Sequence, residues 1–438
     1  MSEPTHPLLP FPPLSLSASL VERCQELSSD TPIPGFLFAG VHAGIKRSSE
    51  ALDVGLISCT STATCAGVYT QNQVVAAPVT LSRRHLASTT QVRAVIVNSG
   101  NANACTGEGG DRDALLMANS VVDQLLESST SLSAAHIQVA STGVIGAPLP
   151  IKKLTDAIPM VVSSLESSGL KRFATAIMTT DNRPKSRALK LNLKGVKGAG
   201  ETTEVMIAGC SKGAGMIHPN MATMLSYLCT DAKVAADDLQ KLWVEVCDHS
   251  FNAITIDGDT STNDTALILA SGESSPLEGS PLQDEALSLF IEATRALATA
   301  LAVDILRDGE GVEHVAHLTV RGARTSTEAR QVAETIALSP LVKTAMNGED
   351  PNWGRIIAAV GRSGVEVDPS VITLCIGGEK IYDRGQWCGL EAEEVAHQAM
   401  CGAEYPIEVD LSLGVSDCTL YTTDLSAQYV RINADYRS

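Results

Sequence analysis

The chain has 438 residues, 44% hydrophobic and 19% charged, which is typical of a folded globular protein with room for more than one domain. A formal net charge of −18 disfavours a nucleic-acid partner, because an acidic surface repels phosphates. Eleven cysteines without C-x-x-C spacing disfavour a disulfide framework or a zinc knuckle and favour a reducing, cytoplasmic location.

The first 34 residues are expected to form a flexible extension, with a short helix near residues 16–27. Prolines crowd residues 1–13, and no basic segment precedes an apolar one there, so a secretory signal is not expected. No apolar run of about 18 residues occurs, so we expect no membrane span.

Short apolar strands dominate the next part of the chain. Residues 111–127 are different, because Leu115, Val122 and Leu126 follow helical spacing and predict an amphipathic helix. Strands are predicted at residues 36–41, 55–59, 94–97, 137–140 and 189–193.

The second half of the chain mixes helices and strands without a regular alternation. Helices are predicted at residues 235–249 and 281–302, and strands at residues 265–270, 371–376, 407–411 and 429–433. No G-x-G-x-x-G sequence stands between a strand and a helix, which disfavours a Rossmann fold.

The most distinctive segment is residues 212–225, which read KGAGMIHPNMATML. A small residue before a threonine, after a turn-rich approach, suits a strained peptide bond that cleaves itself. The Thr223 hydroxyl would attack the Ala222 carbonyl, and hydrolysis after the N→O acyl shift would free the Thr223 α-amine beside its Oγ. The alternative is an ordinary Gly/Pro-rich turn leading into a strand.

This segment resembles the cleavage site of the ornithine acetyltransferase family, the bifunctional glutamate N-acetyltransferases of arginine biosynthesis. Further motifs of that family follow in order, at residues 98–107, 141–146, 176–181, 251–260, 308–311, 348–355 and 431–436. The resemblance implies an α+β fold, a layered α/β/β/α sandwich with a smaller C-terminal α/β lobe. It also implies self-cleavage into an alpha chain, residues 35–222 behind the extension 1–34, and a beta chain, residues 223–438.

The resemblance implies transfer of acetyl from N2-acetyl-L-ornithine to L-glutamate through an acetyl ester on Thr223. The nucleophile would be Thr223, with its own α-amine as the base. The oxyanion hole would be Thr142 and Gly143, since glycine lets a backbone N–H approach closely and a hydroxyl adds a second donor.

Substrate contacts are also implied by the resemblance. Lys212 could hold a substrate carboxylate or lower the pKa of the Thr223 amine. The segment between Asp181 and Lys212 is several residues longer than the family pattern, so either of two neighbouring threonines could be the family's contact. The implied substrate-binding residues are Thr179 or Thr180, Lys212, Thr223, Glu310, Asn433 and Ser438.

No metal and no cofactor are expected. Residues 257–264 lack the calcium-loop pattern and its closing Glu, and the histidines show no H-x-x-x-H pairing. The expected partners are the small-molecule substrates and, by resemblance, the alpha and beta chains of a heterotetramer with two of each. Neither nucleic acid nor membrane is expected.

Two other functions stay open from the sequence. The same nucleophile could serve an N-terminal-nucleophile amidase or aminopeptidase that hydrolyses an acylated amino acid. The other is a non-catalytic relative that binds an amino acid without turnover. That function would require loss of the roles of Thr223, Thr142 or Lys212, and all three residues are present. Whether acetyl-CoA also donates acetyl is not visible in the residues.

Overall fold

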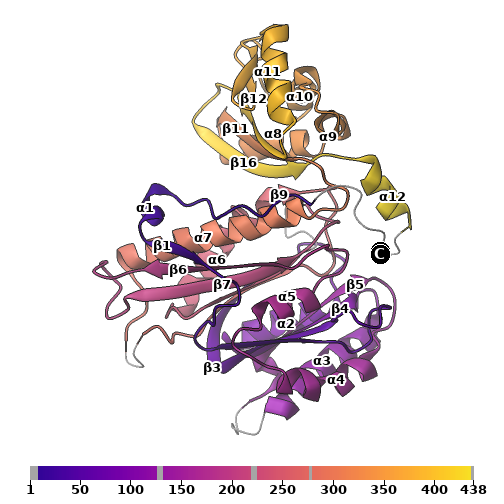
Figure 1. Ribbon diagram of the computed structural model, residues 1–438, viewed down its shortest axis with the longest axis vertical. Helices are drawn as coiled ribbons and strands as arrows, with labels where there is room; N and C mark the ends of the chain where they lie inside the picture. Colours follow the sequence, from indigo (N-terminus) through magenta and orange to yellow (C-terminus); the bar gives the residue numbers. More distant parts are fainter. Residues whose placement is uncertain (1–7, 126–131, 219–223, 276–278, 436–438) are drawn as a thin grey trace.

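The structure, a computed structural model, describes residues 8–125, 132–218, 224–275 and 279–435. It has a large unit built on a nine-stranded sheet and a smaller C-terminal lobe built on a seven-stranded sheet (Figure 1). The expected α+β class with a smaller C-terminal lobe is confirmed.

The large sheet runs in the order β1-β6-β7-β8-β10-β3-β4-β5, and β2 also pairs with β3. Residues 54–58 of the long strand β3 pair with β2 and β4, whereas residues 64–69 pair with β10. The strands are β1 (Cys24–Leu27), β2 (Phe36–Val41), β3 (Val54–Tyr69), β4 (Gln91–Asn101), β5 (Ile137–Val144), β6 (Lys185–Asn192), β7 (Glu204–Lys212), β8 (Leu225–Thr230) and β10 (Thr265–Ala270).

An irregular register between Ser58 and Ala63 lets β3 join two halves of the sheet that pack face to face. Ile57 and Val97 from one half share an apolar cluster with Ala208 and Tyr227 from the other. These buried side chains form the inner layer of the sandwich.

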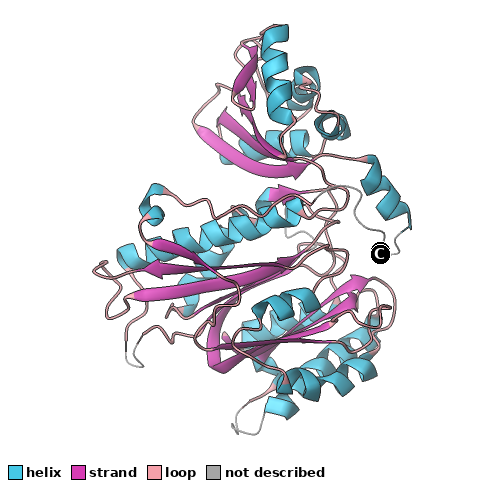
Figure 2. Ribbon diagram, viewed as in Figure 1, coloured by secondary structure: helices cyan, strands magenta, loops and turns pink. Residues whose placement is uncertain are grey.

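Helices cover the two outer faces (Figure 2). One outer face carries α6 (Ala236–Asp248) and α7 (Asp284–Arg307), and the other carries α3 (Gly107–Leu125) and α4 (Ile151–Ser163). The layers therefore run α/β/β/α, as the family resemblance implied. The remaining helices of this unit are α1 (Ala18–Val21), α2 (Ala77–Ser88) and α5 (Leu170–Ala176).

Among the described helices, α7 is long and apolar enough to cross a membrane by length and composition alone. It packs against β6 and β7, and the core helices of globular proteins meet the same criterion.

The C-terminal lobe has strand order β14-β13-β12-β15-β11-β16-β9. Its strands are β9 (Ile254–Thr255), β11 (Val315–Ala323), β12 (Thr373–Ile376), β13 (Glu379–Asp383), β14 (Gln386–Trp387), β15 (Glu404–Asp410) and β16 (Ser416–Thr423). Its helices are α8 (Ser326–Ala337), α9 (Pro340–Asn347), α10 (Trp353–Gly361) and α11 (Leu390–Met400). The last helix, α12 (Ala427–Asp435), leaves the lobe and turns back toward the large unit (Figure 1).

Two local predictions differ from the structure. The strand predicted at residues 429–433 is wrong, because these residues lie in α12, where the Ser426 Oγ accepts a hydrogen bond from the Tyr429 N–H as a helix cap does. In the segment 16–27 only Ala18–Val21 is helical, and Cys24–Leu27 pairs with β6 as strand β1. Among the described residues before Gly35, the side chains of Leu9, Leu20 and Ile33 are buried, so part of this segment packs against the rest of the fold.

Candidate functional site

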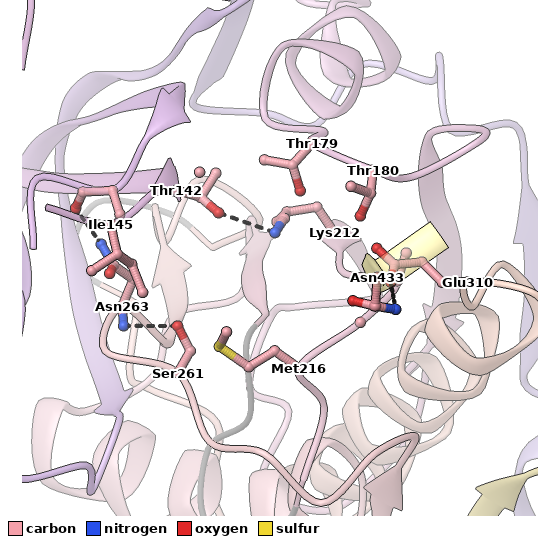
Figure 3. A pocket seen from close by; sticks show the side chains of 14 residues that line it. Thr142, Ile145, Thr179, Thr180, Lys212, Met216, Ser261, Asn263, Glu310 and Asn433 are labelled. Carbon is pink, nitrogen blue, oxygen red and sulfur yellow. Dashed lines mark hydrogen bonds between the residues drawn. The ribbon is translucent and has the colours of Figure 1, made fainter. Parts of the chain in front are cut away.

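A pocket lies in the large unit where several strands end, and α12 closes one side of it (Figure 3). It brings together residues that are far apart in the sequence. The lining residues are Ala102, Thr142, Gly143, Ile145, Thr179, Thr180, Lys212, Ala214, Gly215, Met216, Ser261, Asn263, Glu310 and Asn433. Every described residue that the resemblance assigned to the site is among them.

Thr142 and Gly143 stand at the end of β5, which pairs in parallel with β4. Gly143 has φ of +129°, and a Cβ there would lie 2.4 Å from the Gly100 carbonyl carbon. Only glycine fits this close approach of two backbones. Thr142, 4% exposed, therefore reaches the pocket from a tightly packed strand end.

Lys212 ends β7 and is 3% exposed. Its Nζ donates a 3.0 Å hydrogen bond to the Thr142 Oγ1. The Thr142 oxygen accepts this bond with a lone pair, so the proton of the Thr142 hydroxyl remains free to be donated into the pocket. Burial lowers the pKa of Lys212, while the carboxylates of Asp181, Asp264 and Glu310 act in the opposite direction.

A buried carboxylate fixes the loops around Lys212. Asp181 accepts from the N–H of Thr179 at 2.9 Å, from the N–H of Gly213 at 2.7 Å and from the Lys185 Nζ at 2.6 Å. Burial opposes ionisation of Asp181, but Lys185 and Lys212 outweigh it and lower the pKa of the carboxyl. These bonds hold the loop that carries Thr179 and the end of β7 in fixed positions relative to each other.

The same network extends to the loop that carries Glu310. Lys185 also donates to the Asp308 Oδ2 at 2.6 Å, two residues before Glu310. Burial alone would lower the pKa of Lys185, but Asp181 and Asp308 raise it. Glu310 itself is 8% exposed, and its Oε2 accepts from the Asn433 Nδ2 at 2.9 Å.

Thr179 and Thr180 both follow α5, and their side chains point into the pocket beside Lys212 (Figure 3). The geometry does not separate them, so both stay candidates for the substrate contact.

Ala222, Thr223 and Ser438 lie outside the described residues. The chain on either side of the predicted cleavage site is described, however. Asp257 accepts from the N–H groups of Met216 at 2.6 Å and Ile217 at 2.9 Å, and it also accepts from the Tyr429 hydroxyl of α12. On the other side, the Met224 N–H donates to the Asp264 Oδ1 at 3.0 Å.

Sequence reasoning missed the part of the pocket lined by Ser261 and Asn263. It treated residues 257–264 only as a turn near the site. Asn263 is 5% exposed, and its Nδ2 donates to the Ala102 carbonyl at 2.6 Å and to the Ser141 carbonyl at 2.8 Å. It therefore ties two of the family-like motifs together. The signal was present, because Ser, Thr, Asn and Asp follow one another directly before an apolar strand.

The arrangement suits an amino acid whose amine carries an acyl group. Among the described lining residues, Lys212 is cationic and Glu310 is anionic, which complements a substrate carboxylate and ammonium. Hydroxyls from Thr142, Thr179 and Thr180 add donors between them. A protein with such a pocket can bind a zwitterion and stabilise a developing oxyanion.

The comparisons with known proteins all point to one protein family. The model of the ArgJ family matches residues 37–438. The protein "Arginine biosynthesis bifunctional protein ArgJ" of Syntrophotalea carbinolica is 45% identical over 406 residues, which covers 93% of this chain and 99% of the relative. The protein of the same name from Geobacter sulfurreducens is 44% identical, covering 93% and 100%.

Solved structures give matches of limited extent. The ArgJ protein of Bacillus halodurans is 35% identical, with a TM-score of 0.40, over 45% of this chain and 98% of the solved chain. The ornithine acetyltransferase of Mycobacterium tuberculosis, solved with ornithine, is 38% identical, with a TM-score of 0.39, over the same shares.

Proposed function

This chain belongs to the ArgJ family, and from that premise we propose how its pocket carries out acetyl transfer in arginine biosynthesis. The chain is a glutamate N-acetyltransferase that moves acetyl from N2-acetyl-L-ornithine to L-glutamate and yields ornithine and N-acetylglutamate. Its relatives are named bifunctional, and we infer that acetyl-CoA is also accepted as a donor. Family membership favours transfer over the amidase alternative.

The first event is self-cleavage. The Thr223 Oγ attacks the Ala222 carbonyl, the peptide C–N bond breaks as the acyl group moves to oxygen, and water hydrolyses the ester. The products are a carboxylate at Ala222 and a free α-amine at Thr223. Support comes from Asp257 and Asp264, which hold the described chain just before and just after this segment.

In the first half-reaction the Thr223 α-amine takes the Oγ proton and the Oγ attacks the acetyl carbonyl of N-acetylornithine. The hydroxyl of Thr142 and the N–H of Gly143 donate to the tetrahedral oxyanion. Collapse breaks the amide C–N bond, and the Thr223 ammonium returns the proton to the leaving amine. Ornithine departs and the acetyl group remains as an ester.

In the second half-reaction the amine of glutamate attacks the ester carbonyl and loses a proton to the Thr223 amine. The C–O bond to Thr223 breaks, the Thr223 ammonium returns its proton to the Oγ, and N-acetylglutamate leaves. Lys212 would hold the substrate α-carboxylate, and Glu310 with Asn433 would meet the far end of the ornithine side chain. Thr179 or Thr180 and Ser438 would add neutral hydrogen bonds.

One observation carries this proposal above the others. Residues from β5, β7, the loop after α7 and the terminal helix converge on one pocket, and residues 214–216, a few positions before Thr223, also line it. A turn with no chemical role would not need this convergence.

The test is intact-mass analysis with initial-rate kinetics. The purified protein should give two chains that end and begin at Ala222 and Thr223, and N-acetylornithine should add one acetyl group to the chain 223–438. Double-reciprocal plots at several glutamate concentrations should be parallel, because ornithine leaves before glutamate binds. Intersecting lines, or acetate release that needs no glutamate, would contradict the transfer mechanism.

A heterotetramer of two alpha and two beta chains and a cytoplasmic location complete the proposal. Size-exclusion chromatography with light scattering, run on the cleaved protein, tests the assembly.

A further inference from the structure

A cluster of metal-ligand side chains lies in the C-terminal lobe, apart from the residues that line the acetyl-transfer pocket. Glu349 follows α9, whereas His397 lies in α11 and Cys401 directly follows it. One potential ligand atom from each of the three lies within 4.8 Å of the other two. The spacing in the sequence hides this cluster, because Glu349 is far along the chain from the other two.

His397 is held in one tautomer. Its Nδ1 lies 2.7 Å from the Glu349 carbonyl oxygen, which can only accept, so Nδ1 carries the proton. In the neutral ring the Nε2 lone pair is therefore free to bind a metal, and Nε2 lies 3.7 Å from the Cys401 Sγ. A backbone carbonyl that orients the far nitrogen is the usual support of a metal-binding histidine.

His314 repeats this arrangement on the other side of Glu349. Its Nδ1 lies 3.0 Å from the Gly402 carbonyl oxygen, and its Nε2 lies 3.8 Å from the Glu349 Oε1. The second imidazole is 7% exposed and borders the cluster from the start of β11.

Glu349 occupies a backbone conformation that normally selects glycine. Its φ is +53°, and the Asp350 N–H donates to the Ala345 carbonyl at 2.9 Å, as in a helix-ending Schellman turn. The glycine of this turn, Gly348, stands one position earlier. A carboxylate kept in a disfavoured conformation points to a role for that side chain.

We propose that Glu349, His397 and Cys401 bind a zinc ion. A carboxylate oxygen, an imidazole Nε2 and a thiolate form a ligand set that Zn²⁺ accepts in tetrahedral geometry, whereas Mg²⁺ and Ca²⁺ prefer oxygen alone. Water fills the fourth position, and His314 lines the side of the site next to Glu349. This departs from the expectation of no metal.

Binding has a defined proton balance. The Cys401 thiol now donates to the Glu349 Oε2, with Sγ and oxygen 3.4 Å apart. Zinc replaces that proton, which leaves to solvent, and both the sulfur and the carboxylate oxygen become ligands. The ion would join the turn after α9 to the end of α11, so its effect is to stabilise the lobe and not to take part in acetyl transfer.

The test uses untagged full-length protein, freed of metal with a chelator and titrated with Co²⁺ under reducing conditions. Tetrahedral cobalt with one thiolate ligand gives a sulfur-to-cobalt charge-transfer band and intense visible bands, and added Zn²⁺ should abolish both. Cys401→Ser should lose the charge-transfer band and bind zinc at least about tenfold more weakly. Cys388→Ser is the matched control, because Cys388 is an exposed cysteine of the same lobe.

His397→Gln gives a second readout that keeps the thiol, and it should also weaken zinc binding at least about tenfold. Circular dichroism and acetyl transfer should be unchanged in each variant without metal, which shows that the fold and the pocket are intact. The proposal fails if wild-type protein shows no thiolate band. It also fails if the band survives in Cys401→Ser, or if it is lost in the control Cys388→Ser.

Discussion

The pocket has two walls that the chain builds in different ways. The inner wall carries Thr142 and Lys212 on the ends of buried strands, with exposures of 4% and 3%. The outer wall carries Asn433 on α12, a helix in which no residue is buried. We infer that the inner wall fixes the geometry of the reacting atoms, and that the outer wall mainly holds the substrate.

The two walls also differ in the interactions that hold them. In the inner wall, Asp181, Lys185 and Asp308 form a buried charge network, in which each group needs its partner to offset the cost of burial. The outer wall depends on the bonds from Asn433 to Glu310 and from Tyr429 to Asp257, both at the edge of the pocket. The comparison predicts large losses of rate from inner changes and modest losses of affinity from outer ones.

The largest effect should come from Thr223→Ala. Without the hydroxyl neither self-cleavage nor the acetyl ester can form, so the protein should stay one full-length band on a denaturing gel and show no turnover. Thr80→Ala is the matched control, since Thr80 is exposed on α2. A wild-type protein that also stays uncut after incubation would refute the activated-amine mechanism.

Thr142→Ala tests the inner wall without removing the nucleophile. Loss of one oxyanion donor should lower kcat on the order of 10² to 10³. KM for both substrates should change little, because the donor acts on the transition state. The measurement is steady-state kinetics on protein whose cleavage has been verified by mass. A fall of less than threefold would remove Thr142 from this role.

Lys212 should shape the pH dependence of kcat/KM. Burial lowers the pKa of this ammonium, so its charge is lost at a lower pH than the value of about 10.4 for a free lysine. Activity should therefore fall on the alkaline side below that value, and on the acid side as the Thr223 α-amine becomes protonated and can no longer act as a base. The measurement is the pH profile of kcat/KM for the wild type and for two lysine variants.

In those profiles Lys212→Met should lower kcat/KM on the order of 10- to 100-fold at neutral pH, which corresponds to about 1.5–3 kcal/mol for a charged hydrogen bond. It should also remove the alkaline limb. Lys171→Met, on the exposed side of α5, should leave the profile unchanged. An alkaline limb that persists in Lys212→Met belongs to another group.

The smallest effect should come from the outer wall. Asn433→Ala removes one bond to Glu310 and should raise KM for both substrates about fivefold, equivalent to about 1 kcal/mol. Deleting residues 435–438 should act in the same direction, and self-cleavage should be complete in both variants. Arg431→Ala, an exposed change in the same helix, is the control. Unchanged KM values would show that the tail is an ordinary chain end.

The sequence was informative where a motif requires a particular backbone, and less so where distant contacts decide. The role of Gly143 was implied by the family resemblance, and the structure shows that its backbone packs closely against Gly100. Residues 429–433 were predicted as a strand from their apolar character, but the Ser426 cap and the bond from Tyr429 to Asp257 favour a helix. Asp181 was not singled out, because its partners Lys185 and Gly213 meet it only in the fold.

The strand order of the large sheet has a consequence for how the enzyme refolds after it has been unfolded. β8 and β10, which follow the proposed cleavage site, lie between β7 and β3, which precede it. The uncut precursor folds as one molecule, so its refolding rate should not depend on concentration. Once cut, the two pieces are separate chains that must find each other, and refolding should become second order. After self-cleavage, the native state would therefore persist mainly because it unfolds slowly, since the two separated chains would reassemble less readily than the precursor refolds.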